Sequence, residues 1–181
     1  MVYKRRFNTL AEVFEYSTST YATNHVSSFV DGEQSYTFAQ FRDRCEHLSR
    51  LLSTFGIGAY DKVAILSENM PNWAVAFFSL TAYGRIAVPM LQELSSNEVT
   101  NIINHSESKA IFVSRKQLGK LDETVVEKLN LVIDIETFEF IKVKDTSYTC
   151  DGRVTIPTPL DTAAIIYTSG TTGNAKGVML C

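Results

Sequence analysis

A segment near the end of the sequence combines glycines, hydroxyl side chains and a lysine in a pattern that suits phosphate binding. Its residues are Thr168, Ser169, Gly170, Thr171, Thr172, Gly173, Asn174, Ala175, Lys176 and Gly177. Glycine lacks a Cβ, so the backbone can turn sharply and bring its N–H groups close to a ligand. Successive N–H groups in such a turn form a concave site for an anion. Hydroxyls donate hydrogen bonds to phosphate oxygens, and a lysine adds charge that strengthens the binding. The segment therefore predicts a site for a polyphosphate.

Two other interpretations of this segment are weaker. The Walker A pattern requires the lysine directly after the second glycine and a Ser or Thr after the lysine. Here Lys176 follows Asn174-Ala175, and Gly177 stands where the hydroxyl belongs. The apolar run 178–180 that comes next is typical of a strand and not of a helix start. A surface turn that binds nothing is the plainest alternative, but so many glycines and hydroxyls together with a lysine favour a binding loop.

The elements that must position this loop alternate between strand and helix. Short apolar runs typical of buried strands lie at 62–67, 86–91, 109–113, 129–135 and 161–167, and helices are predicted at 37–55, 71–83, 97–105 and 115–128. Strands that alternate with helices pair in parallel through right-handed crossovers. The pattern predicts an α/β fold with a mainly parallel sheet flanked by helices. Pro89 marks the second of these strands as an edge strand or as the end of a strand.

Local signals define where several of these elements begin. Four capping boxes, each a hydroxyl followed three residues later by Glu or Gln, predict helix starts at Thr9, Thr37, Ser95 and Ser114. A hairpin is predicted around 31–32, where Asp-Gly separates the strands 28–30 and 35–37. The segment 136–160 is predicted to be an irregular surface excursion that joins two parts of one domain spanning 1–181.

Composition narrows the range of functions. The chain has 181 residues, 45% of them hydrophobic and 20% charged, with a formal net charge of −3, which fits a globular domain and argues against a nucleic-acid partner. The three cysteines include no C-x-x-C pair, so neither a disulfide framework nor a zinc site is predicted. The three histidines also lack ligands at metal spacing. The sequence indicates a cytoplasmic protein with no transmembrane segment, and it leaves peripheral attachment to a membrane open.

The run YTSGTTGNAKGVML at 167–180 resembles the phosphate-binding loop of the adenylate-forming (AMP-binding) enzyme superfamily. The segment 35–41, the segment 61–69, Trp73 and the stretch 84–89 resemble further blocks of that superfamily, so the resemblance covers the chain from about Thr9 to its end. The Ser-Glu-Asn run at 67–69, with the nearby Pro-x-Trp, is most similar to long-chain fatty acyl-CoA synthetases. Ala175 departs from the proline common at this position, which leaves the loop backbone less restricted.

The resemblance implies a fold, an activity and ligands. It implies the N-terminal subdomain of the adenylate-forming fold, and an enzyme that uses ATP, Mg²⁺ and coenzyme A to convert a carboxylic acid, here a fatty acid, into a thioester. The implied nucleotide-binding residues are Thr168, Ser169, Gly170, Thr171, Thr172, Gly173 and Lys176. No catalytic residue and no metal ligand is assigned, because the motifs that supply them in this superfamily would follow position 181.

We accordingly expect the chain to be an N-terminal portion of a larger AMP-binding domain, truncated just after the loop and inactive alone. The strand 178–180 would then present an open edge that invites self-association. The alternative is a non-catalytic module that binds nucleotide, or another partner, on the same fold.

Overall fold

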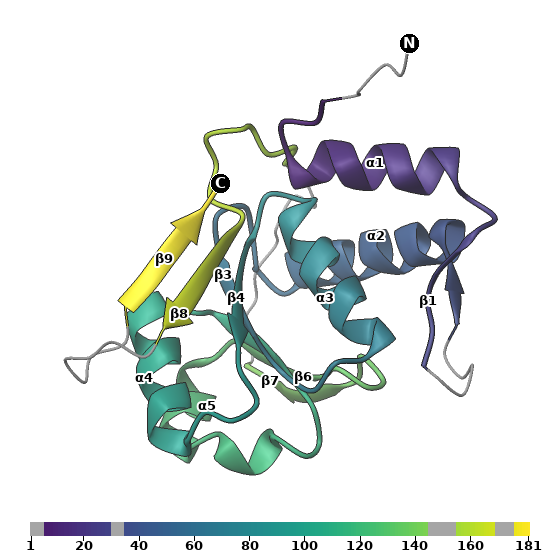
Figure 1. Ribbon diagram of the computed structural model, residues 1–181. Coiled ribbons are helices and arrows are strands. Elements are labelled where there is room, and N and C mark those ends of the chain that lie inside the picture. Colours follow the sequence, from purple (N-terminus) through teal and green to yellow (C-terminus); the bar gives the residue numbers. More distant parts are fainter. Residues whose placement is uncertain (1–5, 30–34, 145–154, 169–175) are drawn as a thin grey trace.

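The computed structural model describes residues 6–29, 35–144, 155–168 and 176–181. Seven strands of this described part form one sheet in the order β7-β6-β5-β3-β4-β8-β9 (Figure 1). Their bounds are β3 Lys62–Leu66, β4 Ile86–Met90, β5 Ala110–Val113, β6 Leu131–Asp134, β7 Phe140–Val143, β8 Ala164–Thr168 and β9 Lys176–Leu180. The five inner strands pair in parallel, whereas β7 and β9 pair antiparallel at the two edges. The predicted α/β class with a mainly parallel sheet is confirmed.

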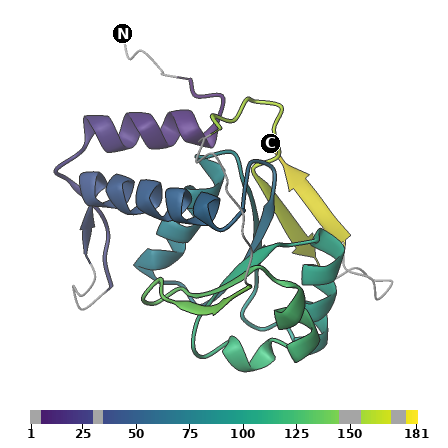
Figure 2. The same ribbon diagram turned by 180° about the vertical axis from the view of Figure 1, so that it is seen from behind.

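Helices cover both faces of the sheet, as the view from behind also shows (Figure 2). Their bounds are α1 Leu10–Thr20, α2 Phe38–Thr54, α3 Pro71–Thr81, α4 Ser96–Ser106 and α5 Glu123–Lys128, with a 3₁₀ turn, η1, at Leu118–Lys120. One apolar cluster packs α1, α2 and α3 against the sheet, and a second packs α4 and α5 against the opposite face. Alternate residues of β3 point into the two clusters, Val63 and Ile65 into the first and Ala64 and Leu66 into the second. This double burial is why the inner strands read as continuous apolar runs and not as alternating ones.

Three of the four predicted helix starts are confirmed. Thr37 and Ser95 begin α2 and α4 with complete capping boxes. Thr9 caps α1 by accepting from the backbone N–H of Glu12, although the Glu12 carboxylate returns to the N–H of Asn8 instead of that of Thr9. Each cap satisfies N–H groups that have no partner within the helix, and for that reason the sequence locates these starts well.

The predicted helix 115–128 is wrong. The chain there makes only η1 and the short α5, and α5 is capped by Asp122, whose carboxylate accepts from the N–H of Thr124. Ser114 does not act as a cap. The Gln117 side chain that would complete the capping box instead donates to Glu68, two residues after the end of β3. A contact between residues distant in sequence has replaced a local one.

Several strand predictions need smaller corrections. β4 is an interior strand, so Pro89 does not mark an edge. Pro89 lies one residue before the end of β4 and beyond Ala87, which forms the single pair with Ala164 of β8. The segment 136–160, predicted to be irregular, contains β7 at the sheet edge. The predicted hairpin pairs β1, His25–Ser27, with β2, Tyr36–Thr37, so its first strand lies earlier than predicted and its turn lies outside the described residues.

Among the described helices, none combines the length and the apolar character needed to cross a bilayer.

Candidate nucleotide-binding site

The predicted phosphate-binding segment joins the two strands of an antiparallel hairpin at the edge of the sheet. β8 and β9 pair in register from Ala164 with Leu180 to Thr168 with Lys176, and the hairpin lies beside α4 (Figure 1). Thr168 and Lys176 are therefore cross-strand neighbours at the point where the connecting segment leaves the sheet. The other predicted site residues, Ser169, Gly170, Thr171, Thr172 and Gly173, lie outside the described residues.

Thr168 and Lys176 are both exposed and both available to a ligand. Paired residues of neighbouring strands point to the same face of a sheet, so the hydroxyl and the ammonium group share one side of the hairpin. Neither side chain forms a hydrogen bond or an ion pair with any other part of the chain that the structure describes. A hydroxyl donor and a cation side by side, with no described carboxylate paired to the lysine, can bind an anionic oxygen.

Gly177 is required by the packing on the opposite face of the hairpin. A Cβ at this position would lie 2.9 Å from Ile165 Cγ2 and 3.2 Å from Tyr167 Cζ. Tyr167 is the cross-strand partner of Gly177, and its side chain occupies the space that the glycine leaves open. The glycine that follows the lysine thus serves side-chain packing in the hairpin.

Tyr167 also links the hairpin to α4. Its Oη lies 2.7 Å from His105 Nδ1, and the two rings meet edge to face with their centroids 5.6 Å apart. Partial burial raises the pKa of Tyr167 above its ordinary value. The sequence did not predict the contact with His105, because the two residues are 62 positions apart. This contact holds β8 in place at Tyr167, the residue directly before Thr168.

The start of β8 is held by a second local structure. The Asp161 carboxylate accepts from the N–H of Thr158 at 2.7 Å and from its hydroxyl at 2.9 Å, which closes the turn that leads into the strand. The backbone bond lowers the pKa of Asp161, and the hydroxyl bond adds to the effect. The N–H of Ala87 in β4 donates to the carbonyl of Ala163. Both ends of β8 are therefore positioned by contacts outside the hairpin.

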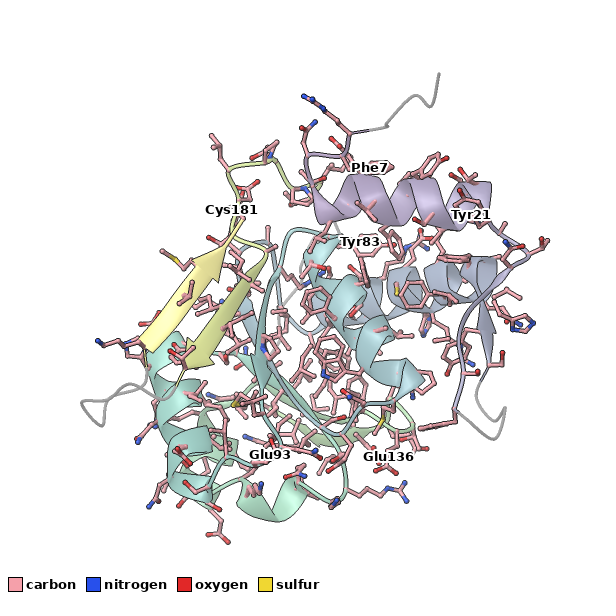
Figure 3. All side chains as sticks on the ribbon, viewed as in Figure 1. Phe7, Tyr21, Tyr83, Glu93, Glu136 and Cys181 are labelled. Carbon is pink, nitrogen blue, oxygen red and sulfur yellow. The ribbon has the colours of Figure 1, made fainter. Side chains whose placement is uncertain are left out.

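A cavity of about 230 Å³ lies at the opposite end of the hairpin from Thr168 and Lys176. It lies between Phe7 and Cys181, the residue after β9, both labelled in Figure 3, and its lining includes Pro157 and Pro159. It shares no residue with the predicted phosphate site. No group of three or more His, Cys, Asp or Glu side chains in the described ranges is arranged to hold a metal ion.

β9 is the outer strand of the described sheet, as predicted. All five of its residues are exposed, and Val178 and Leu180 lie with Ile166 on the same face as Thr168 and Lys176. An apolar strip therefore runs along the hairpin from its polar end.

The chain is similar in sequence to known enzymes along most of its length. The AMP-binding enzyme family matches residues 14–181. The 3-[(3aS,4S,7aS)-7a-methyl-1,5-dioxo-octahydro-1H-inden-4-yl]propanoyl:CoA ligase of Rhodococcus jostii is 29% identical over 175 residues, which cover 85% of this chain and 34% of the ligase. Long chain acyl-CoA synthetase 4 of Arabidopsis thaliana is 28% identical over 198 residues, covering 93% of this chain and 29% of the synthetase. The chain spans about a third of the length of these relatives.

A solved structure of similar fold is the fatty acyl-adenylate ligase from L. pneumophila in complex with acyl adenylate and pyrophosphate. It superposes with a TM-score of 0.76 at 20% identity, over 97% of this chain and 30% of the ligase chain. At this level of identity the likeness supports the fold, which is thus that of the N-terminal part of an adenylate-forming enzyme.

Proposed function

Because this chain belongs to the AMP-binding enzyme family, we propose that the whole protein is an ATP-dependent acyl-activating enzyme. In the first half-reaction, a carboxylate oxygen of the acid forms a bond to the α-phosphorus of ATP. The bond between that phosphorus and the oxygen bridging to the β-phosphate breaks, and pyrophosphate leaves with the electron pair. In the second, the sulfur of coenzyme A attacks the acyl carbonyl carbon, AMP leaves and the thiol proton is released.

The observation that carries this proposal is the pairing of Thr168 with Lys176 at the end of the β8–β9 hairpin. Negative charge builds on the departing pyrophosphate in the first step, and preorganised donors with a nearby cation stabilise such charge best. Both side chains lack partners in the described part of the chain and share one face. We assign the Thr168 hydroxyl a hydrogen bond to a phosphate oxygen, and Lys176 the neutralisation of its charge.

The remaining members of the segment complete the proposed site. From their chemistry we assign backbone and hydroxyl donors for the β- and γ-phosphates to Ser169, Gly170, Thr171, Thr172 and Gly173. The contact of Tyr167 with His105 supports this role indirectly, because it fixes the strand from which the segment departs. Mg²⁺ would accompany the ATP, but the described residues offer it no ligand set, and we assign it none.

We propose a fatty acid as the acid that is activated. Two observations support this choice: the Ser-Glu-Asn run at 67–69 resembles that of fatty acyl-CoA ligases, and a relative matched along nearly the whole chain is named long chain acyl-CoA synthetase. We also propose that the protein is located in the cytoplasm, which the free thiols of Cys45 and Cys181 support.

The test is carboxylate-dependent exchange of pyrophosphate into ATP by the full-length protein, across acids from acetate to long-chain fatty acids. Exchange with one chain-length class would establish adenylation and identify the substrate. Binding of ATP without exchange for any acid would contradict the proposal and favour a non-catalytic nucleotide-binding module.

Lys176→Ala tests the assigned residue. A hydrogen bond to a charged group contributes about 1.5–3 kcal/mol, so exchange should fall roughly ten- to a hundredfold. Lys116→Ala removes a lysine that is 74% exposed and near Glu68, away from the hairpin, and should leave exchange unchanged. Equal rates for the two variants would show that Lys176 does not act on the phosphates.

We propose in addition that the 181-residue chain, studied by itself, associates through β9, the outer strand of the described sheet. The outer strand has unpaired backbone groups that a second strand can pair with, and the exposed Val178 and Leu180 add apolar surface. Light scattering over a range of concentrations should show dimers, and a strict monomer at high concentration would contradict this.

A further inference from the structure

A surface groove of about 510 Å³ lies along the outer side of α2, where this helix faces the turn between β6 and β7. In the view from behind, α2 crosses the front of the molecule and the turn lies below it (Figure 2). The apolar residues of its lining are Leu48, Leu51 and Phe138, which we call its floor. The polar residues of the lining are Gln40, Asp43, Arg44, His47 and Thr137. Its volume falls in the range typical of small-molecule sites, about 300–1,000 Å³.

Arg44 is held in a defined orientation at this groove. Its guanidinium carbon lies 4.6 Å from the centroid of the Tyr36 ring, in the position of a cation–π contact. Tyr36 is itself fixed, because it is buried and its hydroxyl donates to Asn72 Oδ1 at 2.7 Å. The buried Asn72 amide donates in turn to the carbonyls of Ile135 and Glu136. A guanidinium stacked on a rigid ring keeps the N–H groups at its edge available to a planar anion.

The positive charge of Arg44 is not matched from within the described chain. The guanidinium forms no ion pair or hydrogen bond with another described residue, and the same is true of the His47 ring one helical turn later. Asp43 also lines the groove, but Arg42 Nε lies 3.7 Å from its carboxylate and offsets part of its charge. The groove therefore offers an oriented cation and an imidazole beside an apolar floor.

Phe138 occupies its place in the floor at a conformational cost. Its φ is +61°, in the left-handed region that bulky side chains avoid. The conformation is held by the bond from its N–H to the carbonyl of Asp134 at 2.7 Å and by an edge-to-face contact with Phe112. Strain of this kind costs about 1–3 kcal/mol and is concentrated at functional sites. It supports a role for this turn beyond chain reversal.

We propose that this groove binds an amphiphilic monocarboxylate. Its carboxylate would accept from the guanidinium of Arg44 and from His47, and its hydrocarbon chain would lie along Leu48, Leu51 and Phe138. A single negative charge fits better than a phosphate dianion, because Asp43 lies at the same groove and repels additional charge. This inference is independent of the proposed function, since it uses none of the residues of the β8–β9 hairpin.

The experiment is a titration of the ¹⁵N-labelled full chain with decanoate, followed by amide chemical shifts. Saturable shifts are expected on the outer side of α2 and in the turn 136–139. Arg44→Gln should weaken binding at least tenfold. Arg50→Gln is the matched control, because Arg50 is exposed on the same helix, pairs with Glu46 and does not line the groove; it should bind decanoate as the unchanged chain does.

Decanol, which has the same chain length and no charge, should bind at least tenfold more weakly than decanoate. Three outcomes would overturn the proposal: no saturable shift on α2, an equal loss in the Arg44 and Arg50 variants, or equal binding of decanol and decanoate. Shifts confined to the β8–β9 hairpin would be a case of the first outcome, and they would leave the phosphate-site assignment untouched.

Discussion

Replacing Gly177 with alanine should destabilise the β8–β9 hairpin, although alanine is normally the better residue in a strand. The added Cβ would lie 2.9 Å from Ile165 Cγ2 and 3.2 Å from Tyr167 Cζ. Neither neighbour can move away easily. The Ile165 methyl is attached directly to its own Cβ, and the Tyr167 ring is held by its contact with His105. The variant must therefore shift the strands or break that contact.

The expected magnitude is the difference between two opposing effects. Overpacking of this kind costs about 1–3 kcal/mol. The loss of backbone freedom in the unfolded chain returns about 0.4–1 kcal/mol. From the midpoints of the two ranges, the net destabilisation is about 1.3 kcal/mol, and for a domain of this size the Tm should fall by about 3–5 °C.

Thermal unfolding followed by circular dichroism measures this change, with Gly119→Ala as the control. A Cβ on Gly119 meets nothing within 4 Å, so that variant should have an unchanged or higher Tm. A Gly177 variant as stable as the Gly119 variant would refute the steric reasoning. If the Gly177 variant were less stable but had normal ATP–pyrophosphate exchange in the full-length protein, the packing around Gly177 would not be needed to position the phosphate site.

Three further predictions follow from other parts of the fold. Gly84→Ala should destabilise the fold more than the Gly177 variant does, by about 2–4 kcal/mol, because Gly84 has a φ of +78° and an added Cβ would lie 2.9 Å from the carbonyl oxygen of Thr155. An unchanged midpoint of urea unfolding would contradict this. Iodoacetamide should label Cys181 rapidly and Cys45 only after unfolding, because Cys181 is exposed whereas burial raises the pKa of the Cys45 thiol; equal labelling in the native state, read by peptide mass, would show that the core opens. Hydrogen bonds from Ser95, the cap of α4, lower the pKa of Glu98 below its ordinary 4.5, so the stabilisation by the Glu98 carboxylate is complete above about pH 4.5 and is lost as the pH falls through the folded pKa. Glu98→Gln should be less stable than the unchanged chain at neutral pH and equally stable in acid, and a difference that persists in acid would refute this.

The sequence by itself determined the features that depend on neighbouring residues. The helix starts at Thr37 and Ser95 were predictable because a cap joins groups only three residues apart. The strands β3, β5 and β6 were predictable because burial on both faces leaves a continuous apolar run. The chemistry of the segment 168–177 was readable for the same reason, since its glycines, hydroxyls and lysine are adjacent in the chain.

Features that join distant parts of the chain were decided by the tertiary structure. No local signal sets β3 between β4 and β5, or reveals β7 at one edge of the sheet. The failure of Ser114 as a cap depends on the bond from Gln117 to Glu68, which lies 49 positions away.

The candidate site shows the same division. Its residue types came from the sequence, but only the folded hairpin places Thr168 opposite Lys176, and only the packing of α4 brings His105 to Tyr167. The physical reason is that a cap or a turn is stabilised by groups already held close along the backbone. A cross-strand pair or a contact between a helix and a strand forms only once the whole core has ordered the chain around it.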